Sequence, residues 1–235
     1  MMKKQMRITT YVGLFIGIFA AAFVGRVSSA RAATDFMTSW QAKTYVPAWY
    51  IGKAMPAYQS FITVGFELID DGKIADLSKT IVRWYIDDKL FKNEDNGVGI
   101  KKVTVYNQKY GGDVTSIKIS IPNYKGVPLE RSIDIPVKDQ EVVIDVPFFD
   151  KRIPKGDDAM FAWPFFFNAP TMDMLGLQWN TPGSEAKQAG NILEPLILTV
   201  GRDIPQGTQY EVGATIGNLR KNSESATKSV IVETR

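Results

Sequence analysis

The chain has 235 residues, with 28 Lys and Arg, 25 Asp and Glu, and neither cysteine nor histidine. Without these two residue types the chain cannot form Ser-His-Asp triads, cysteine nucleophiles, disulfides or the usual zinc and copper ligand sets. Five basic residues and no acid lie within the first 32 positions, so the remainder carries 23 basic and 25 acidic residues. It is slightly acidic and has no basic run with interleaved aromatics, so nucleic acid is not an expected partner.

The N-terminal element predicts export. A basic start is followed by 18 uncharged residues at 8–25 and by an A-x-A site that ends at Ala32. This order is typical of a secretory signal peptide over 1–32. The same span reaches the lower limit for crossing a bilayer, so an uncleaved N-terminal membrane anchor stays open as the alternative. Both alternatives predict an exported protein, at the cell surface, outside the cell or in the periplasm, with membrane contact through 8–25 if the segment is retained.

Beyond Thr34 apolar residues alternate with polar ones, as in half-buried antiparallel strands. The alternating runs lie, in chain order, at 62–68, 82–86, 117–121, 133–137, 142–146, 175–179, 196–200, 210–216 and 230–232. Turn sequences such as DDGK and NYKG separate them. No helical stripe longer than two turns follows the signal. The sequence therefore predicts an all-β fold, a sandwich or a barrel.

An internal repeat indicates duplication. Trp84 falls on Trp179 at a shift of 95 residues, and the run at 61–69 falls on 160–168 at a shift of 99. The matching segments occur in the same order in both halves. We therefore expect two similar domains.

With one tryptophan in the same alternating context in each half, the chain resembles tandem bacterial Ig-like domains. The resemblance implies two antiparallel β-sandwiches, with domain one at 38–138 and domain two at 139–235. It also implies that Trp84 and Trp179 pack in the centre of their sandwiches. It implies no particular function, because this fold serves many functions.

The run MFAWPFFFN at 160–168 is either a surface platform or a buried strand. The repeat places four of its aromatic side chains on the inward face of the sandwich: Phe161, Trp163, Phe165 and Phe167. Trp163 is thus expected in the core with Trp84 and Trp179. Phe166 is expected to point to solvent, and Pro164 predicts a bulge or a sheet edge because proline cannot donate to a neighbouring strand.

Aromatic residues outside the expected core are candidate ligand-binding residues: Trp49, Tyr50, Tyr85 and Phe166. Exposed coplanar rings on a sandwich would favour carbohydrate binding. This requires that at least two rings of a set share one solvent-facing surface, the set being Trp49, Tyr50, Tyr85, Phe148, Phe149 and Phe166. The aromatics at 39–58 have an alternative role, as a first strand and a cover over the open edge of domain one.

Acidic pairs in turns are candidate calcium ligands: Asp70, Asp71, Asp87 and Asp88. Calcium prefers such oxygen ligands from neighbouring loops. Loop solubility explains the pairs equally well, and no D-x-D-x-D-G spacing is present. No other cofactor is expected, and no residue pattern indicates catalysis.

Three functions follow from these predictions. The leading hypothesis is a non-enzymatic structural or adhesive module that binds another cell-envelope component. The second is a surface protein that binds polysaccharide. The third is a two-domain Ig-like periplasmic chaperone, which rests on chain length and architecture alone.

Overall fold

The computed structural model describes residues 34–91, 98–181 and 187–235. These residues form strands and one short 3-10 helix at Met172–Met174, so the predicted all-β class is confirmed. The predicted signal or anchor at 1–32 lies outside the described residues. Over the described ranges, no helix has the length and hydropathy needed to cross a membrane.

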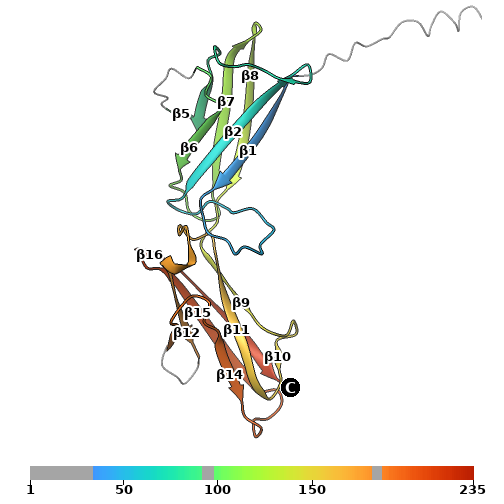
Figure 1. Ribbon diagram of the computed structural model, residues 1–235, viewed down its shortest axis with the longest axis vertical. Coiled ribbons are helices and arrows are strands. Elements are labelled where there is room, and N and C mark those ends of the chain that lie inside the picture. Colours follow the sequence, from blue (N-terminus) through green and yellow to red (C-terminus); the bar gives the residue numbers. More distant parts are fainter. Residues whose placement is uncertain (1–33, 92–97, 182–186) are drawn as a thin grey trace, which may run out of the picture. The chain divides into compact units, whose positions relative to one another are not determined.

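The first half of the chain forms two antiparallel sheets (Figure 1). One sheet has the order β1-β2-β3, and β6 also pairs with β2. Its strands are β1 (Asp35–Ala42), β2 (Phe61–Asp70), β3 (Lys73–Ile74) and β6 (Lys102–Tyr106). The other sheet has the order β5-β4-β7-β8. Its strands are β4 (Arg83–Ile86), β5 (Lys89–Leu90), β7 (Val114–Tyr124) and β8 (Val127–Pro136).

The second half of the chain also forms two sheets. The smaller has the order β14-β11-β9, with β9 (Glu141–Asp145), β11 (Gly156–Phe165) and β14 (Leu196–Val200). The larger has the order β10-β16-β15-β12-β13. Its strands are β10 (Arg152–Ile153), β12 (Leu175–Asn180), β13 (Lys187–Gln188), β15 (Gln209–Asn218) and β16 (Lys221–Thr234). The domain boundary at 138/139 stays a prediction.

The chain divides into two compact units, and of the described residues Thr34, Asp35 and Leu68–Ala75 belong to the first. The end of β2 turns back into β3 here, with Ile69 opposite Ile74. Ala75 N–H donates to the carbonyl of Leu68 at 2.8 Å, which closes the hairpin.

The remaining described residues, from 36 to 67 and from 76 onward, form the larger unit. In its first half, side chains alternate between inside and outside as the sequence predicts. Ile62 and Val64 on β2 are fully buried, and Phe66 packs against Trp84 on β4 with ring centroids 5.7 Å apart. Trp84 is 1% exposed, and its indole N–H donates to the carbonyl of Ile100 at 2.9 Å. The two sheets of this half therefore face each other across an apolar core.

The second half has the same arrangement around Trp179. This side chain is 2% exposed on β12 and donates its indole N–H to the carbonyl of Glu194 at 3.2 Å. Inward side chains of both sheets meet it in one core: Met160, Ala162, Leu175, Leu177, Val212, Ala214, Ile216 and Val232. Each tryptophan thus satisfies its single polar atom with a carbonyl from a later loop, as a buried indole must.

The face of β11 differs from the prediction. Met160 and Ala162 point into the core, whereas Phe161 and Trp163 are half-buried on the opposite face. The predicted core position of Trp163 is therefore wrong. The alignment of this strand with 61–69 is off by one residue, and a one-residue slip moves every side chain to the other face of a sheet.

The end of β11 explains how three successive phenylalanines are buried. Phe166 adopts a left-handed backbone with φ of 63°. This turn ends the alternation, so Phe165, Phe166 and Phe167 are 6%, 6% and 0% exposed. Phe166 N–H donates to the carbonyl of Tyr45, and Tyr45 N–H donates to the carbonyl of Phe167, both at 2.7 Å. At Pro164 the predicted sheet edge is present, because β14 pairs with β11 only up to Met160 and β9 is the one strand paired with Pro164. The predicted exposure of Phe166 is wrong.

The left-handed backbone at Phe166 gives a test of this strand end. A side chain in that conformation costs about 1–2 kcal/mol, which glycine avoids. We expect both Phe166→Ala and Phe166→Gly to lower the free energy of unfolding by several kcal/mol, about 3–5 for the alanine variant. The glycine variant should be the more stable of the two by about 1 kcal/mol, measured by chemical denaturation.

The adjacent Phe167 is the matched control, because its φ is not positive. There Phe167→Gly should be less stable than Phe167→Ala by about 0.5–1 kcal/mol, the usual order for the two residues. The same order at both positions would contradict the strained backbone at Phe166.

Candidate functional site

The predicted ligand-binding aromatics differ in their exposure to solvent. Trp49 is 55% exposed and Tyr50 next to it is half-buried. Tyr85 is half-buried on β4, where Lys118 Nζ lies 4.7 Å from the centre of its ring. Phe166 is buried. Of the four, Trp49 is the one that presents most of its ring to solvent.

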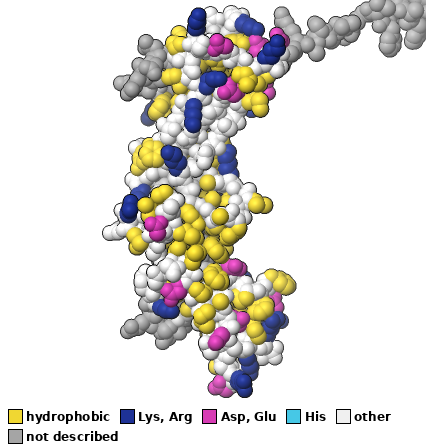
Figure 2. Space-filling model, viewed as in Figure 1, with side chains coloured by type: hydrophobic (Ala, Val, Ile, Leu, Met, Phe, Trp, Pro, Cys, Tyr) yellow, Lys and Arg dark blue, Asp and Glu magenta, His cyan; other side chains and the backbone are white. Residues whose placement is uncertain are grey.

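Trp49 instead joins the two outward aromatics of β11. Its ring centroid lies 5.5 Å from that of Trp163, at an interplanar angle of 86°. Phe161 lies on the other side of Trp163, with ring centroids 6.2 Å apart and planes within 24°. We call these three residues the aromatic face. Figure 2 shows hydrophobic side chains gathered over the region where Figure 1 places β9 and β11.

Aliphatic and acidic side chains extend the aromatic face on its own sheet. Opposite residues of antiparallel strands project to the same side, and Val143 lies opposite Trp163. On the other flank Ile197 lies opposite Ala159, so it projects to the same side as Phe161. Val143 is 38% and Ile197 53% exposed. Asp145 lies opposite Phe161 and is exposed, which gives the face an acidic border.

A second layer of apolar side chains supports Trp49 from below. Phe165 contacts both Trp49 and Tyr50 edge to face, at centroid distances of 5.9 and 5.2 Å. Phe165 and Phe166 form a buried cluster with Ala57. The segment at 43–60 is therefore held against the end of β11 by packing as well as by the Tyr45 hydrogen bonds.

A buried carboxylate fixes the chain just after this cluster. Glu224 is 3% exposed and accepts hydrogen bonds from Gln140 Nε2 at 2.9 Å, Asn168 N–H at 2.6 Å and Asn218 Nδ2 at 2.8 Å. Asn168 Nδ2 in turn donates to the carbonyl of Tyr58 at 2.8 Å. With three donors on its two oxygens, this carboxylate is a structural anchor.

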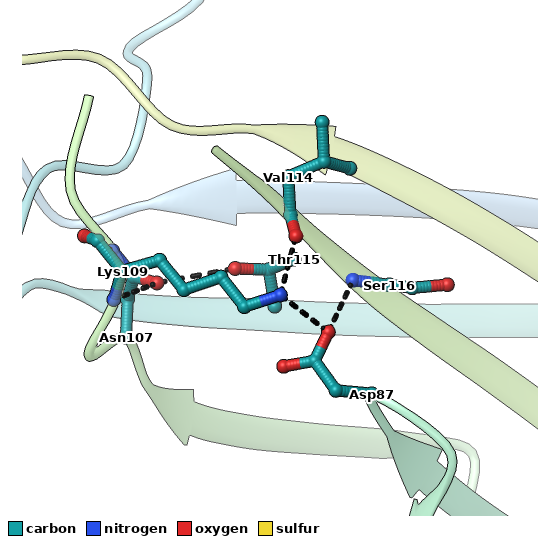
Figure 3. A network of polar contacts seen from close by, with 6 residues as sticks. All are labelled: Asp87, Asn107, Lys109, Val114, Thr115 and Ser116. Carbon is teal, nitrogen blue, oxygen red and sulfur yellow. Dashed lines mark hydrogen bonds and ion pairs between the residues drawn. The ribbon is translucent and has the colours of Figure 1, made fainter. Parts of the chain in front are cut away.

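The acidic pairs predicted as calcium ligands make other contacts. Lys109 Nζ lies 2.6 Å from Asp87 Oδ1, and the same oxygen accepts the backbone N–H of Ser116 at 3.1 Å (Figure 3). Lys109 also donates to the carbonyl of Val114 at 2.5 Å. The Asp87 carboxylate is thus already paired with an ammonium group. Asp88 is largely exposed, 3.9 Å from Lys118.

The other acidic pair lies in the turn between β2 and β3. Asp70 accepts a hydrogen bond from Thr34 Oγ1 at 3.1 Å, and Asp71 takes a left-handed turn conformation with φ of 50°. Nowhere in residues 34–91, 98–181 and 187–235 do three or more carboxylates lie close enough together to hold a metal ion.

The sequence analysis missed Phe161 and Trp163 as surface residues. The reason is that both faces of β11 carry apolar side chains. Met160 and Ala162 point to one face, and Phe161 and Trp163 point to the other. The repeat alone therefore assigns the buried face, and its shift of 99 residues places the aromatics inward. The neighbouring β9 carries a signal that distinguishes the two: Val143 stands between Glu141 and Asp145, which is an outward face.

No protein-family model and no curated protein matches the sequence. Among solved structures the chain is similar to fibronectin(III)-like modules of Clostridium thermocellum CbhA, at 11% identity and a TM-score of 0.29, over 85% of this chain and 94% of that one. It is also similar to SGBP-B of the Bacteroides ovatus mixed-linkage glucan utilization locus, solved in complex with a mixed-linkage heptasaccharide. That match has 12% identity and a TM-score of 0.24, over 86% of this chain and 47% of that one. At these values neither similarity indicates a shared ligand or function.

The Lys109–Asp87 contact leads to a prediction about calcium. We expect neither added calcium nor a chelator to change the unfolding temperature, because an ammonium group already neutralises Asp87. Lys109→Met is the matched variant, and it should lower the unfolding temperature because Asp87 loses its counter-charge. Calorimetry of both proteins with and without calcium makes the test. A calcium-dependent rise in the wild-type protein would contradict it.

Asp158 on β11 is a second titratable group with an unusual environment. It lies on the same alternation as Met160, and its Oδ2 is buried without a hydrogen-bond partner among the described atoms. Desolvation raises the pKa of this carboxyl, and Asp157 adds to the rise, while the positive charge of Arg235 opposes it. The ionised form of Asp158 is therefore disfavoured in the folded protein.

The raised pKa predicts that Asp158 destabilises the fold when it is ionised. As pH rises past about 4, the unfolded chain releases this proton before the folded chain does, so stability falls until the folded pKa is passed. We expect Asp158→Asn to raise the unfolding temperature at neutral pH, with a gain that shrinks as the pH falls through that window. Asp134→Asn is the control, because Asp134 is exposed on β8 in the other half of the chain. A gain at Asp158 that does not depend on pH would contradict the prediction.

Proposed function

We propose that this protein is a non-enzymatic, exported binding module that docks another cell-envelope component on its aromatic face. The observation that carries the proposal is the contact of Trp49, Phe161 and Trp163 on one partly exposed surface. A monomeric protein seldom leaves such a group of large apolar side chains in water unless a partner covers it. The basic start and uncharged stretch at 8–25 support export.

A protein partner is the favoured occupant of the face. Tryptophan and other aromatic side chains dominate the energetics of protein interfaces, where a polar rim surrounds them. Here the aromatics are flanked by aliphatic Val143 and Ile197, and Asp145 stands at the border. This composition suits a partner with an apolar patch and basic residues beside it.

A surface polysaccharide is the second candidate, and the exposure of Trp49 favours it. Trp49 is 55% exposed and stands almost perpendicular to Trp163, at 86°. Phe161 and Trp163 stack on each other, with planes 24° apart, so they do not form a coplanar platform with Trp49. A sugar ring would contact the exposed part of the Trp49 indole with its apolar face.

The aromatic face predicts a loss of binding on replacement of Trp49. We expect Trp49→Gln and Phe161→Gln each to weaken binding of the purified protein to isolated cell-envelope fractions by about tenfold or more, the effect of removing an interface hot spot. Binding is measured by cosedimentation over a range of protein concentrations. Tyr106→Gln is the matched control, because Tyr106 is 47% exposed on β6 and pairs with Phe61 outside the face. Equal losses in all three variants would overturn the proposal.

Pretreatment of the envelope fraction distinguishes a protein partner from a polysaccharide partner. Protease digestion should abolish the Trp49-dependent binding if the partner is a protein. Periodate oxidation should abolish it if the partner is a polysaccharide. Thermal unfolding of each variant shows whether it is folded, so that lost binding is not confused with lost structure.

A further inference from the structure

Strands β9 and β16 each leave one edge open, and a groove lies between them. Among the described residues β9 pairs only with β11, along its whole length. β16 pairs with β15 on one side, and on the other with β10 at Glu233 and Thr234 alone. The free side of β9 and the middle of β16 therefore present backbone N–H and C=O groups that no described strand pairs with, which is a template for a further strand.

The groove has a volume of about 380 Å³ and an apolar floor. Four half-buried side chains on its lining pack against the core of this half of the chain: Ile144, Val146, Phe148 and Val230. They belong to the edge of the core, yet part of each stays in contact with water. A strand laid along the groove would bury this remaining apolar surface, which favours binding.

The charge of the groove selects the kind of strand. Lys151 and Lys228 line it, and neither takes part in an ion pair within the described parts of the chain. Glu141, at the start of β9, is the one acidic residue among the described lining residues. Two unpaired ammonium groups beside an apolar floor suit a segment that carries both apolar and acidic residues.

We propose that this groove binds an extended acidic segment of a partner protein, which adds a strand to the free edge of β9. Main-chain hydrogen bonds to the edge supply affinity, and every second side chain of the segment enters the groove. An extended polypeptide repeats its N–H and C=O groups at the spacing of the edge itself, about 3.3 Å per residue. The acidic residues of the segment reach Lys151 and Lys228. This site uses the edge of β9, whereas the aromatic face uses its outward side chains.

A designed peptide tests the proposal on the full-length protein. The probe is a fluorescent octapeptide in which valine and glutamate occupy the positions that face the groove and threonine or serine occupies the positions between them. We expect saturable binding by fluorescence anisotropy, with slower hydrogen exchange at amides of Glu141–Asp145 and 226–231. Methylation of every second backbone nitrogen of the peptide should abolish binding, because it removes the main-chain donors and leaves the side chains in place.

Charge reversal in the groove supplies the second measurement. We expect Lys151→Glu with Lys228→Glu to weaken peptide binding by about fivefold or more, in line with the loss of two exposed ion pairs. Lys102→Glu, at an exposed lysine on β6, is the control and should leave binding unchanged. Trp49→Gln should also leave peptide binding unchanged. The groove and the function proposed for the aromatic face are therefore tested separately.

Three results would overturn the proposal. The first is the absence of saturable binding, and the second is equal binding of the methylated peptide. The third is protection of the same amides without peptide at protein concentrations where the chain dimerises, which would assign the groove to a second copy.

Discussion

The second half of the chain depends on a pair of backbone hydrogen bonds between Tyr45 and the end of β11. Phe166 N–H and Phe167 C=O both bond to Tyr45, at 2.7 Å each, and they face it together because Phe166 has a left-handed backbone. That conformation is costly for a side chain with a Cβ. It persists because the phenylalanines on both sides of it are buried, so the energy of packing exceeds the strain.

The same constraint builds the aromatic face. The strand must end at Phe165 for Phe167 to enter the core behind it and for Phe166 to enter the cluster with Ala57. Phe165 then lies under Trp49, and the segment that carries Trp49 is held by Tyr45. Trp49 therefore reaches Trp163 through the strand end rather than through a sheet of its own. A surface built in this way is positioned by buried residues, as a binding site requires.

The alternation of apolar and polar residues predicts much of the fold. It does not predict which face of β11 is buried. On β2 the polar residues Thr63 and Glu67 alternate with the apolar ones, so Ile62 and Val64 are assigned to the core. On β11 the residues that point to either side are apolar. The pattern therefore predicts a strand but does not show which of its faces is buried. The left-handed Phe166 has no local sequence signal, because that conformation usually indicates glycine or asparagine. Here the packing of residues distant in the sequence sets the backbone of Phe166, and such contacts leave no signal in the local sequence.

The short strand β9 connects the two surfaces of this half of the chain. Its inward Val142 fills the core, its outward Val143 and Asp145 extend the aromatic face, and its free edge borders the groove. A strand added at that edge would continue the sheet β14-β11-β9 by one position. Every second side chain of the added strand would then project to the face of the sheet that carries Val143 and Trp163. Because of this geometry, a ligand in the groove and a ligand on the aromatic face would meet along β9, so the two sites are neighbours on one sheet.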